Sequence, residues 1–442
     1  GEPLTTEDVC HEIVRPRTQA HRGAWQVDVR AELTAPANAY VCHCWRYPFA
    51  ELVDALEAAD LGEGAVFWLD VVAVSQWEAP EVTEQWLGTE LPSLISSVGR
   101  TLLVLAPWAE PLPLQRAWCL LELHATVESW SELHVAMPRE QGAAFSAGLA
   151  ARFDEVASTL ARLSIESARA SLEADERAIA SAVRSGVGSA VLNARVLDAL
   201  RSWLAHAAGA VVDAQPHEHG LALSLAKLHH MQGELDEAEE LYERVHTARE
   251  AALGAAHAET LVVLDKLATV LMDQGRLDEA EPLYRHALEA REASLGAQHA
   301  DTLISLHNLA ALLKARGQLG AAEELYARGL AAREATLGGA HALTLASTNQ
   351  LACTLQDQGK LEMAEPLFRR VLETRERELG VSHPHTLASV NNLALMLKAA
   401  SRLDEAQALY VRALHGREVV LGVDHPHTLI SVNNLALLLQ AR

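Results

Sequence analysis

Cysteine is scarce in this sequence, and the five that occur are scattered along 442 residues. An odd and dispersed set argues against the disulfide framework that stabilises small secreted domains. The scarcity is typical of a reducing compartment, so we expect a cytoplasmic protein. Long hydrophobic runs are lacking as well. No uncharged apolar stretch approaches the length of a membrane-spanning helix, and we expect no membrane span.

Basic residues are also few compared with acidic ones. Lysine is absent from the first 214 residues, where 15 arginines face 29 aspartates and glutamates, a balance of −14. Over the whole chain the formal net charge is −23. Such an acidic surface repels phosphate backbones. We therefore expect neither nucleic acid nor an anionic membrane as a partner.

The second half of the chain contains a repeat of 42 residues. Its clearest phrase is Leu-Gly-x-x-His, whose histidines are His257, His299, His341, His383 and His425. A turn glycine keeps the same spacing at Gly233, Gly275, Gly317 and Gly359, with Ser401 in the fifth place. A fixed period of this length predicts a solenoid, in which each unit buries its apolar face against its neighbours.

Each unit has the pattern of two helices. Within residues 386–398, apolar residues recur three and four apart, which predicts a helix with one buried stripe. A second helix is predicted from Leu403 and should end at Gly422, for which we expect the left-handed cap conformation. Pro384 and Pro426 stand where the following helices begin, a position that tolerates proline.

The unit HPHTLASVNNLALMLKAASRLDEAQALYVRALHGREVVLG, at residues 383–422, resembles the tetratricopeptide repeats (TPRs) of kinesin light chains. The resemblance covers about residues 215–442, as five repeats, the first of them degenerate, followed by one lone helix. It implies an all-α TPR solenoid. It also implies that the first helices of the units line a groove that binds peptide segments of a protein ligand.

Polar residues at equivalent helix positions indicate where that groove lies. Positions seven apart share a helix face, so Asn391 should lie above Lys398, beside the buried stripe. The same columns contain His307, Lys314, Asn349 and Asn433. A carboxamide can donate to and accept from a peptide backbone, and lysines would favour acidic ligands. The alternative is that the asparagines only satisfy neighbouring helix ends. Their recurrence at groove-facing positions favours binding.

The sequence predicts no metal site. The repeated histidines occur once per unit, about a repeat width apart, so no two can share an ion. We expect them to have a structural role at the junction between helices. Cys42, His43 and Cys44 lack a second ligand pair nearby in sequence, and we interpret the two cysteines as buried small hydrophobic residues.

Strands and helices alternate through residues 36–150. Strands are predicted over 39–44, 65–72, 101–106 and 133–137, and helices over 49–59, 81–98 and 114–128. This alternation predicts a parallel sheet covered on both faces. Ligands collect at the carboxyl ends of such strands, where Trp45, Arg46 and Asp70 stand. We expect a helical extension over residues 1–35 and a helical bridge over 151–214.

The segment RAWCLLEL at residues 116–123 resembles the Trp-Cys-Leu-x-Glu-Leu signature of TIR (Toll/interleukin-1 receptor) domains. With the phrases YVCHCWRYPF, FWLDVVAVSQW and GRTLLVLAPW, the resemblance spans about residues 36–137. It extends to TIR-like domains fused to these same repeats in protists and algae. It implies a flavodoxin-like α/β fold and a homo-oligomer formed through this domain.

In TIR domains that cleave NAD, the glutamate at the Glu122 position is catalytic. The resemblance therefore implies that Glu122 is a catalytic residue with NAD as substrate. Trp118, one helical turn away, would join Trp45, Arg46 and Asp70 in binding the nucleotide. Two phrases depart from the family pattern, at 42–45 and at 75–77. The competing interpretation is a core tryptophan with an exposed glutamate on an amphipathic helix.

Three functions follow as hypotheses. The first is an interaction scaffold whose TPR groove binds peptide segments and whose TIR-like domain acts as a signalling effector. The second is a NAD glycohydrolase that depends on Glu122. The third is a kinesin-light-chain-like cargo adaptor, which we consider weaker because nothing in the given sequence sustains the heptad pattern by which kinesin light chains reach the heavy chain. No resident cofactor is predicted.

Overall fold

The structure is a computed structural model that describes residues 3–15, 36–59, 61–62, 64–70, 83–170, 173–423 and 425–440. The chain divides into two compact units, residues 1–241 and 242–442. Several predicted features lie outside the described residues, namely the part of the helical extension at 16–35, the phrase at 75–77, the end of the strand at 65–72 and the start of the helix at 81–98.

The first unit is built on a four-stranded parallel sheet with the order β2-β1-β3-β4. Its strands are β1 (Ala39–Cys42), β2 (Phe67–Trp68), β3 (Arg100–Val104) and β4 (Glu132–Ala136). β1 lies between β2 and β3, and Val41 is in register with Leu102 of β3. The predicted parallel sheet is therefore present, with strands shorter than the apolar runs suggested.

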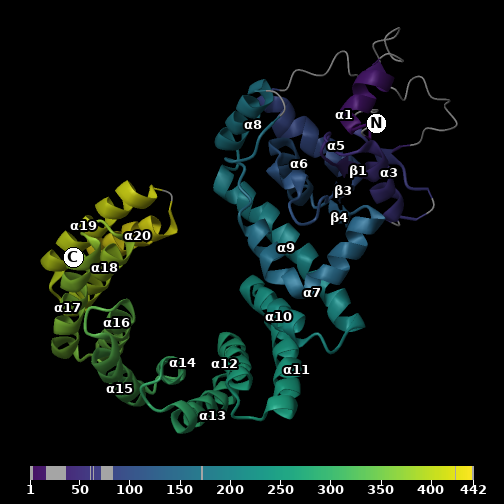
Figure 1. Cartoon of the computed structure of the whole chain (residues 1–442). Coiled ribbons are helices and arrows are strands. Elements are labelled where there is room, and N and C mark those ends of the chain that lie inside the picture. The colour runs from purple at the N-terminus through teal and green to yellow at the C-terminus, as the bar shows by residue number, and fades with distance from the viewer. Residues whose placement is uncertain are drawn as a thin grey trace. The chain divides into compact units, whose positions relative to one another are not determined.

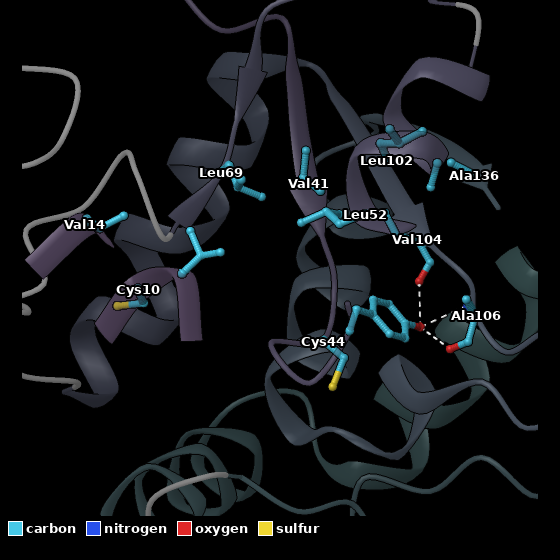
Figure 2. Close-up of a cluster of buried hydrophobic side chains, with 13 residues drawn as sticks. Cys10, Val14, Val41, Cys44, Leu52, Leu69, Leu102, Val104, Ala106 and Ala136 are labelled. Carbon is cyan, nitrogen blue, oxygen red and sulfur yellow. Dashed lines mark hydrogen bonds between the residues drawn. The ribbon is translucent and has the colours of Figure 1, made fainter. Parts of the chain in front are cut away.

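One face of the sheet is covered by α3 (Phe49–Ala58) and by the short helices α1 (Thr6–Val9) and η1 (Cys10–Val14). Val41, Leu102 and Val104 point to this face, where they form one buried cluster with Leu52 of α3 (Figure 2). Tyr47 closes the cluster, because its hydroxyl group hydrogen-bonds to the backbone of Val104 and Ala106.

Alternate residues of the strands face the other way, as the two-residue period of a strand requires. There they meet α5 (Leu91–Val98), which follows η4 (Trp86–Glu90), and α6 (Ala117–Glu128), which follows η5 (Leu112–Gln115). Tyr40 and Cys42 both contact α6. Helices thus cover both faces, as the strand–helix alternation predicts.

Helices continue the first unit beyond the sheet. They are α7 (Arg139–Ala161), α8 (Glu173–Ser185), α9 (Ser189–Ala214) and α10 (His219–Gln232). α9 packs against α6, α7 and α10, and it buries an apolar stripe that includes Leu192, Val196 and Leu200. The segment predicted as a bridge is helical and forms part of the same compact unit as the sheet.

The second unit begins within α11 (Leu235–Leu253) and repeats a helix pair. The first helices are α12 (Ala258–Asp273), α14 (Ala300–Ala315), α16 (Ala342–Asp357), α18 (Pro384–Ala399) and α20 (Pro426–Gln440). The second helices are α13 (Leu277–Leu295), α15 (Leu319–Leu337), α17 (Leu361–Leu379) and α19 (Leu403–Leu421). Within this unit α12, α14 and α16 lie on the inner side of the curved row, and α13, α15 and α17 on its outer side (Figure 1).

The repeated histidines cap the first helices. His383 precedes α18 in an extended conformation, and its Nδ1 accepts a hydrogen bond from the backbone N–H of His385 at 3.2 Å. The same bond recurs at His257, His299, His341 and His425. Each histidine satisfies one of the backbone donors that a helix leaves unpaired at its start. This is the structural role that the sequence predicts.

Glycine ends the second helices in a conformation different from the one expected. Gly422 has φ 92° and ψ 163°, an extended backbone with positive φ that is nearly exclusive to glycine, so the predicted left-handed helical cap is wrong at this position. Left-handed helical geometry occurs instead at the turn glycine Gly233, with φ 80° and ψ 11°. Ser401 takes the equivalent turn position with φ 61°, although it has a side chain.

An arginine at an equivalent position of each second helix, buried in three and half-buried at Arg375, is a repeat feature that the sequence reasoning missed. Arg417 donates to the hydroxyl of Ser431, 14 residues later, at 2.6 Å and to the carbonyl of His427 at 2.8 Å. The pairs Arg291–Ser305, Arg333–Ser347 and Arg375–Ser389 repeat the contact. The signal was present as an Arg-Glu dipeptide with the 42-residue spacing. Each arginine ties a second helix to the next first helix.

No helix among the described residues is both long and apolar enough to cross a membrane.

Candidate peptide groove and carboxylate cluster

The first helices of the second unit share an exposed stripe of mixed chemistry. On α12 and α14 its apolar members are Val262 and Ile304, which are 46% and 50% exposed. The equivalent surface of α18 and α20 exposes Leu395, Ile430 and Leu437. These residues lie outside the buried stripe that packs the repeat, so repeat packing does not explain them. The stripe is the candidate peptide groove.

A cavity of about 190 Å³ opens in this stripe between α12 and α14. Its walls include Val262, Ile304 and Asn308, and Asp265 lies beside them. Asp265 is only 8% exposed, and it forms an ion pair with Arg291 through Oδ2. Its other oxygen, Oδ1, has no hydrogen-bond partner among the described residues. A buried acceptor beside a cavity can receive an N–H group from a bound chain.

Two of the predicted groove asparagines also bind the neighbouring repeat. The Oδ1 of Asn349 accepts a hydrogen bond from Nδ2 of Asn392 at 3.0 Å. The Oδ1 of Asn391 accepts one from Asn434, also at 3.0 Å. Asn391 is 9% exposed, so it is more buried than its expected place beside the apolar stripe implies. The carbonyl oxygens of this column therefore connect one first helix to the next.

The remaining predicted groove residues differ in how available they are. His307 packs edge-on against Tyr326, and burial lowers the pKa of its imidazole. Lys314 forms an ion pair of 2.8 Å with Asp357, which offsets its charge. Lys398 has no acidic partner in the part of the chain that the structure describes. Asn433 is exposed. The preference for acidic ligands predicted from the lysines thus depends mainly on Lys398.

The structure points to a neighbouring column that sequence reasoning passed over. The column that contains Asp265, His307, Asn349, Asn391 and Asn433 is followed at each position by a second polar residue. These second residues are Lys266, Asn308, Gln350, Asn392 and Asn434. Lys266 and Asn308 both line the cavity. The consecutive pairs Asn391–Asn392 and Asn433–Asn434 were the signal that could have identified this column.

In the first unit, Glu122 lies on α6, on the face of the sheet that this helix covers. Its Oε1 accepts a hydrogen bond of 2.7 Å from the hydroxyl of Tyr40 on β1. The side chain is half-buried, and desolvation raises the pKa of the Glu122 carboxyl to about 7, against an opposing hydrogen bond from Cys42. A carboxyl with such a pKa can exchange a proton near neutral pH.

Two cysteines complete this carboxylate cluster. Ligand atoms of Cys42, Cys119 and Glu122 all lie within 4.8 Å of one another. This is the one group among the described residues whose donors could hold a metal ion, and a tetrahedral zinc site would need a further ligand. Burial raises the pKa of the Cys42 thiol well above its ordinary value, which disfavours the thiolate that a metal requires.

The predicted nucleotide-binding residues do not converge on one place. Trp45 and Asp70 do meet, because the indole N–H donates to the carboxylate at 2.7 Å. Trp118 instead donates to Asp175 of α8 at 3.2 Å. Arg46 lines a separate cleft to which neither tryptophan nor Glu122 contributes. Glu122 and Trp118 share a helix but bind different neighbours.

The geometry of the second unit is that of tetratricopeptide repeats, and comparison with protein families agrees. Two models, both described as tetratricopeptide repeat, match residues 262–335 and residues 221–259, 344–385 and 386–427. The chain therefore contains tetratricopeptide repeats over most of its second half. A comparison with curated proteins gives no sequence match.

Solved structures similar to the chain include kinesin-light-chain-like repeats. A candidate kinesin light chain of Podosopora anserina with nearly identical TPR-like repeats is 29% identical, with 45% of this chain and 95% of that chain covered and a TM-score of 0.43. BtubC (BKLC) from P. vanneervenii is 23% identical, with 52% and 92% covered and a TM-score of 0.43. YrrB, a TPR protein with an unusual peptide-binding site, is 16% identical, with 52% and 99% covered and a TM-score of 0.32.

Proposed function

We propose that this protein is an interaction scaffold whose TPR groove binds an extended peptide segment of a partner protein. The observation that carries the proposal is the exposed stripe of the first helices, which alternates apolar side chains with amide groups. Apolar residues such as Ile304 can pack against peptide side chains, while Asn308, which lines the cavity, can hydrogen-bond to a peptide backbone.

The cavity between α12 and α14 supports this proposal. Asp265 keeps one buried oxygen without a partner among the described residues, and leaving a buried acceptor unpaired costs about 1–3 kcal/mol. A peptide N–H that reaches Oδ1 would recover this free energy. Because Arg291 and Lys266 already offset the negative charge nearby, a neutral backbone N–H fits the site better than a cationic side chain.

A peptide selection tests the proposed function. Random displayed peptides are selected on the full chain, and the affinity of an enriched sequence is then measured by titration calorimetry. We expect Ile304→Asp to weaken binding by about tenfold or more, because it places a charge where an apolar contact forms. Val411→Asp is the matched control, since Val411 is 48% exposed on the second helix α19. Unchanged affinity for Ile304→Asp, or failure to enrich any peptide, contradicts the proposal.

We further propose that the first unit is a TIR-like effector domain. The parallel strand order β2-β1-β3-β4 supports this, because it matches the start of the flavodoxin-like order. The placement of Trp118 and Glu122 on α6 also agrees with the motif. The effector role would couple peptide capture in the groove to signalling by this domain.

NAD cleavage with Glu122 as the catalytic residue is the enzymatic alternative. The observation in its favour is the perturbed carboxyl, whose pKa of about 7 is typical of functional sites. NAD consumption by the full chain is measured over a range of protein concentrations, because assembly through this domain is expected. Glu122→Gln should abolish turnover, whereas Glu128→Gln on the exposed side of α6 should not. Equal turnover in both variants rejects the assignment. The cargo-adaptor role stays a prediction that no described feature favours.

A further inference from the structure

A cleft of about 520 Å³ lies in the first unit, at the carboxyl ends of β1 and β3. Its walls come from three segments far apart in sequence. The loop after β1 contributes Cys44 and Arg46, and the loop and η5 after β3 contribute residues 110–112 and 114–116. The end of α7 with the following turn contributes residues among 159–170. Glu122 and Trp118 do not line it, so this cleft is separate from the carboxylate cluster.

The cleft lies where the strand order reverses, between β1 and β3. β1 and β3 are neighbours, but the helices that follow them cover opposite faces, α3 on one side and α6 on the other. The loops leaving the two strands therefore diverge and open a crevice outside their carboxyl ends. In open parallel sheets this is the place where ligands bind.

Arginines surround the cleft. Arg46, Arg116, Arg162 and Arg169 all line it, against a single carboxylate, Glu110. Four of the 15 arginines in residues 1–214 thus meet at one cleft, in a region whose balance is −14. The acidic surroundings repel anions from most of this unit. A local concentration of positive charge therefore marks the cleft as a place that can attract an anion.

Two of these arginines are available to a ligand. Arg169 is engaged, because it forms an ion pair of 3.1 Å with Glu176. Arg46 and Arg162 are exposed, and neither has an acidic partner among the described residues. They belong to different segments, so their guanidinium groups can approach one ligand from two sides. A guanidinium presents paired N–H donors that match the oxygens of a phosphate group.

We propose that this cleft binds a phosphorylated small molecule, with Arg46 and Arg162 holding the phosphate. The volume is that of a site for a small organic ligand. Pro111, Leu112, Leu114 and Leu163 supply apolar walls for its carbon part. The described lining contains no aromatic ring on which a nucleobase could stack, so the ligand class is a sugar phosphate or a similar phosphate ester.

Titration calorimetry of the full chain with ribose 5-phosphate, inorganic phosphate and ribose tests this proposal. We expect ribose 5-phosphate to bind most tightly, inorganic phosphate to bind more weakly and ribose not to bind. Arg46→Ala and Arg162→Ala should each weaken ribose 5-phosphate binding by about tenfold, since each removes a charge-assisted contact. Binding should also weaken as the salt concentration rises.

Arg177→Ala is the matched control, because Arg177 is an arginine of α8 outside the cleft. It should leave the affinity unchanged. The proposal is overturned if ribose 5-phosphate does not bind, if the control weakens binding as much as the cleft variants, or if inorganic phosphate binds as tightly as the ester. Thermal unfolding of each variant shows whether it is folded. These outcomes concern the first unit alone, so they do not test whether the groove of the second unit binds peptides.

Discussion

The side-chain amide of Asn434 donates a hydrogen bond to the carbonyl oxygen of Asn391, 3.0 Å away and 43 residues earlier. Asn392 and Asn349 form the same bond one repeat earlier in the chain. Each bond joins the first helices of consecutive repeats beside the candidate groove. The asparagines therefore stabilise the stacking of repeats, and any role in peptide capture is added to this one.

Removal of one partner should destabilise the array. Asn392→Ala leaves the carbonyl oxygen of Asn349 without its donor, and we expect a loss of about 1 kcal/mol in the free energy of unfolding. Urea unfolding followed by circular dichroism measures this loss. Asn433→Ala is the control, because Asn433 is exposed and should tolerate the change. Equal losses in both variants would show that the inter-repeat bond contributes nothing.

The carboxyl of Glu122 should make stability depend on pH. Its pKa is raised from 4.5 to about 7, so the folded protein holds this proton more tightly than the unfolded chain. The stabilising contribution is complete below about pH 4.5 and is lost as the pH rises through 7.

Glu122→Gln removes this titration while it keeps the size of the side chain. At pH 8 the variant should be more stable than the wild type by a free energy of unfolding on the order of 1–3 kcal/mol, whereas near pH 5 the difference should be small. Unfolding by urea at both pH values measures the difference. If the substitution has the same effect at pH 5 and pH 8, the buried carboxyl is not the cause.

Ser401 should be a position where glycine improves stability. Its φ of 61° is unfavourable for a residue with a Cβ atom, and the equivalent turn positions contain glycines with φ of 75–80°. The greater freedom of glycine in the unfolded chain offsets part of the gain. We expect Ser401→Gly to raise the free energy of unfolding by about 0.5–1 kcal/mol. Ser401→Ala should give no such gain, and a gain of equal size there would contradict the backbone explanation.

His383 should be replaceable by another capping residue but not by alanine. His383→Ala removes the acceptor for the backbone N–H of His385, at a cost of about 0.5–2 kcal/mol. His383→Asn keeps an acceptor near the same N–H group and should retain most of the stability. Thermal unfolding distinguishes the two. His415→Ala, on the exposed side of α19, controls for the loss of an imidazole. If His383→Asn loses as much stability as His383→Ala, the histidine does not stabilise the protein through the helix cap.

The TPR array could be predicted closely because its signals are local. Pro384 begins α18 and Leu403 begins α19, at the positions that the apolar period and the proline indicated. Helix spacing, caps and turns each involve residues within a few positions of one another. The 42-residue period repeats those signals, so a weak cue in one unit is strengthened by the next. Even the unexpected conformation of Gly422 left the helix boundary where the sequence had placed it.

The sites were decided by contacts that no local pattern contains. Tyr40 and Glu122 are 82 residues apart in the chain, and Cys42 and Cys119 are 77 apart, yet they share one cluster. The sequence placed Glu122 on a helix with Trp118, but it could not show that the two side chains would bind different neighbours.

For this protein, the sequence by itself determined the approximate places of the helices and strands, the strand–helix alternation and the repeated helix pairs, because short-range periodicity is enough to specify them. Tertiary structure alone decided which polar groups are used up within the fold and which remain for ligands. Asn391 proved to be engaged with Asn434, while the cleft at Arg46 emerged from three distant segments. The availability of a polar group depends on partners that only the folded chain brings near.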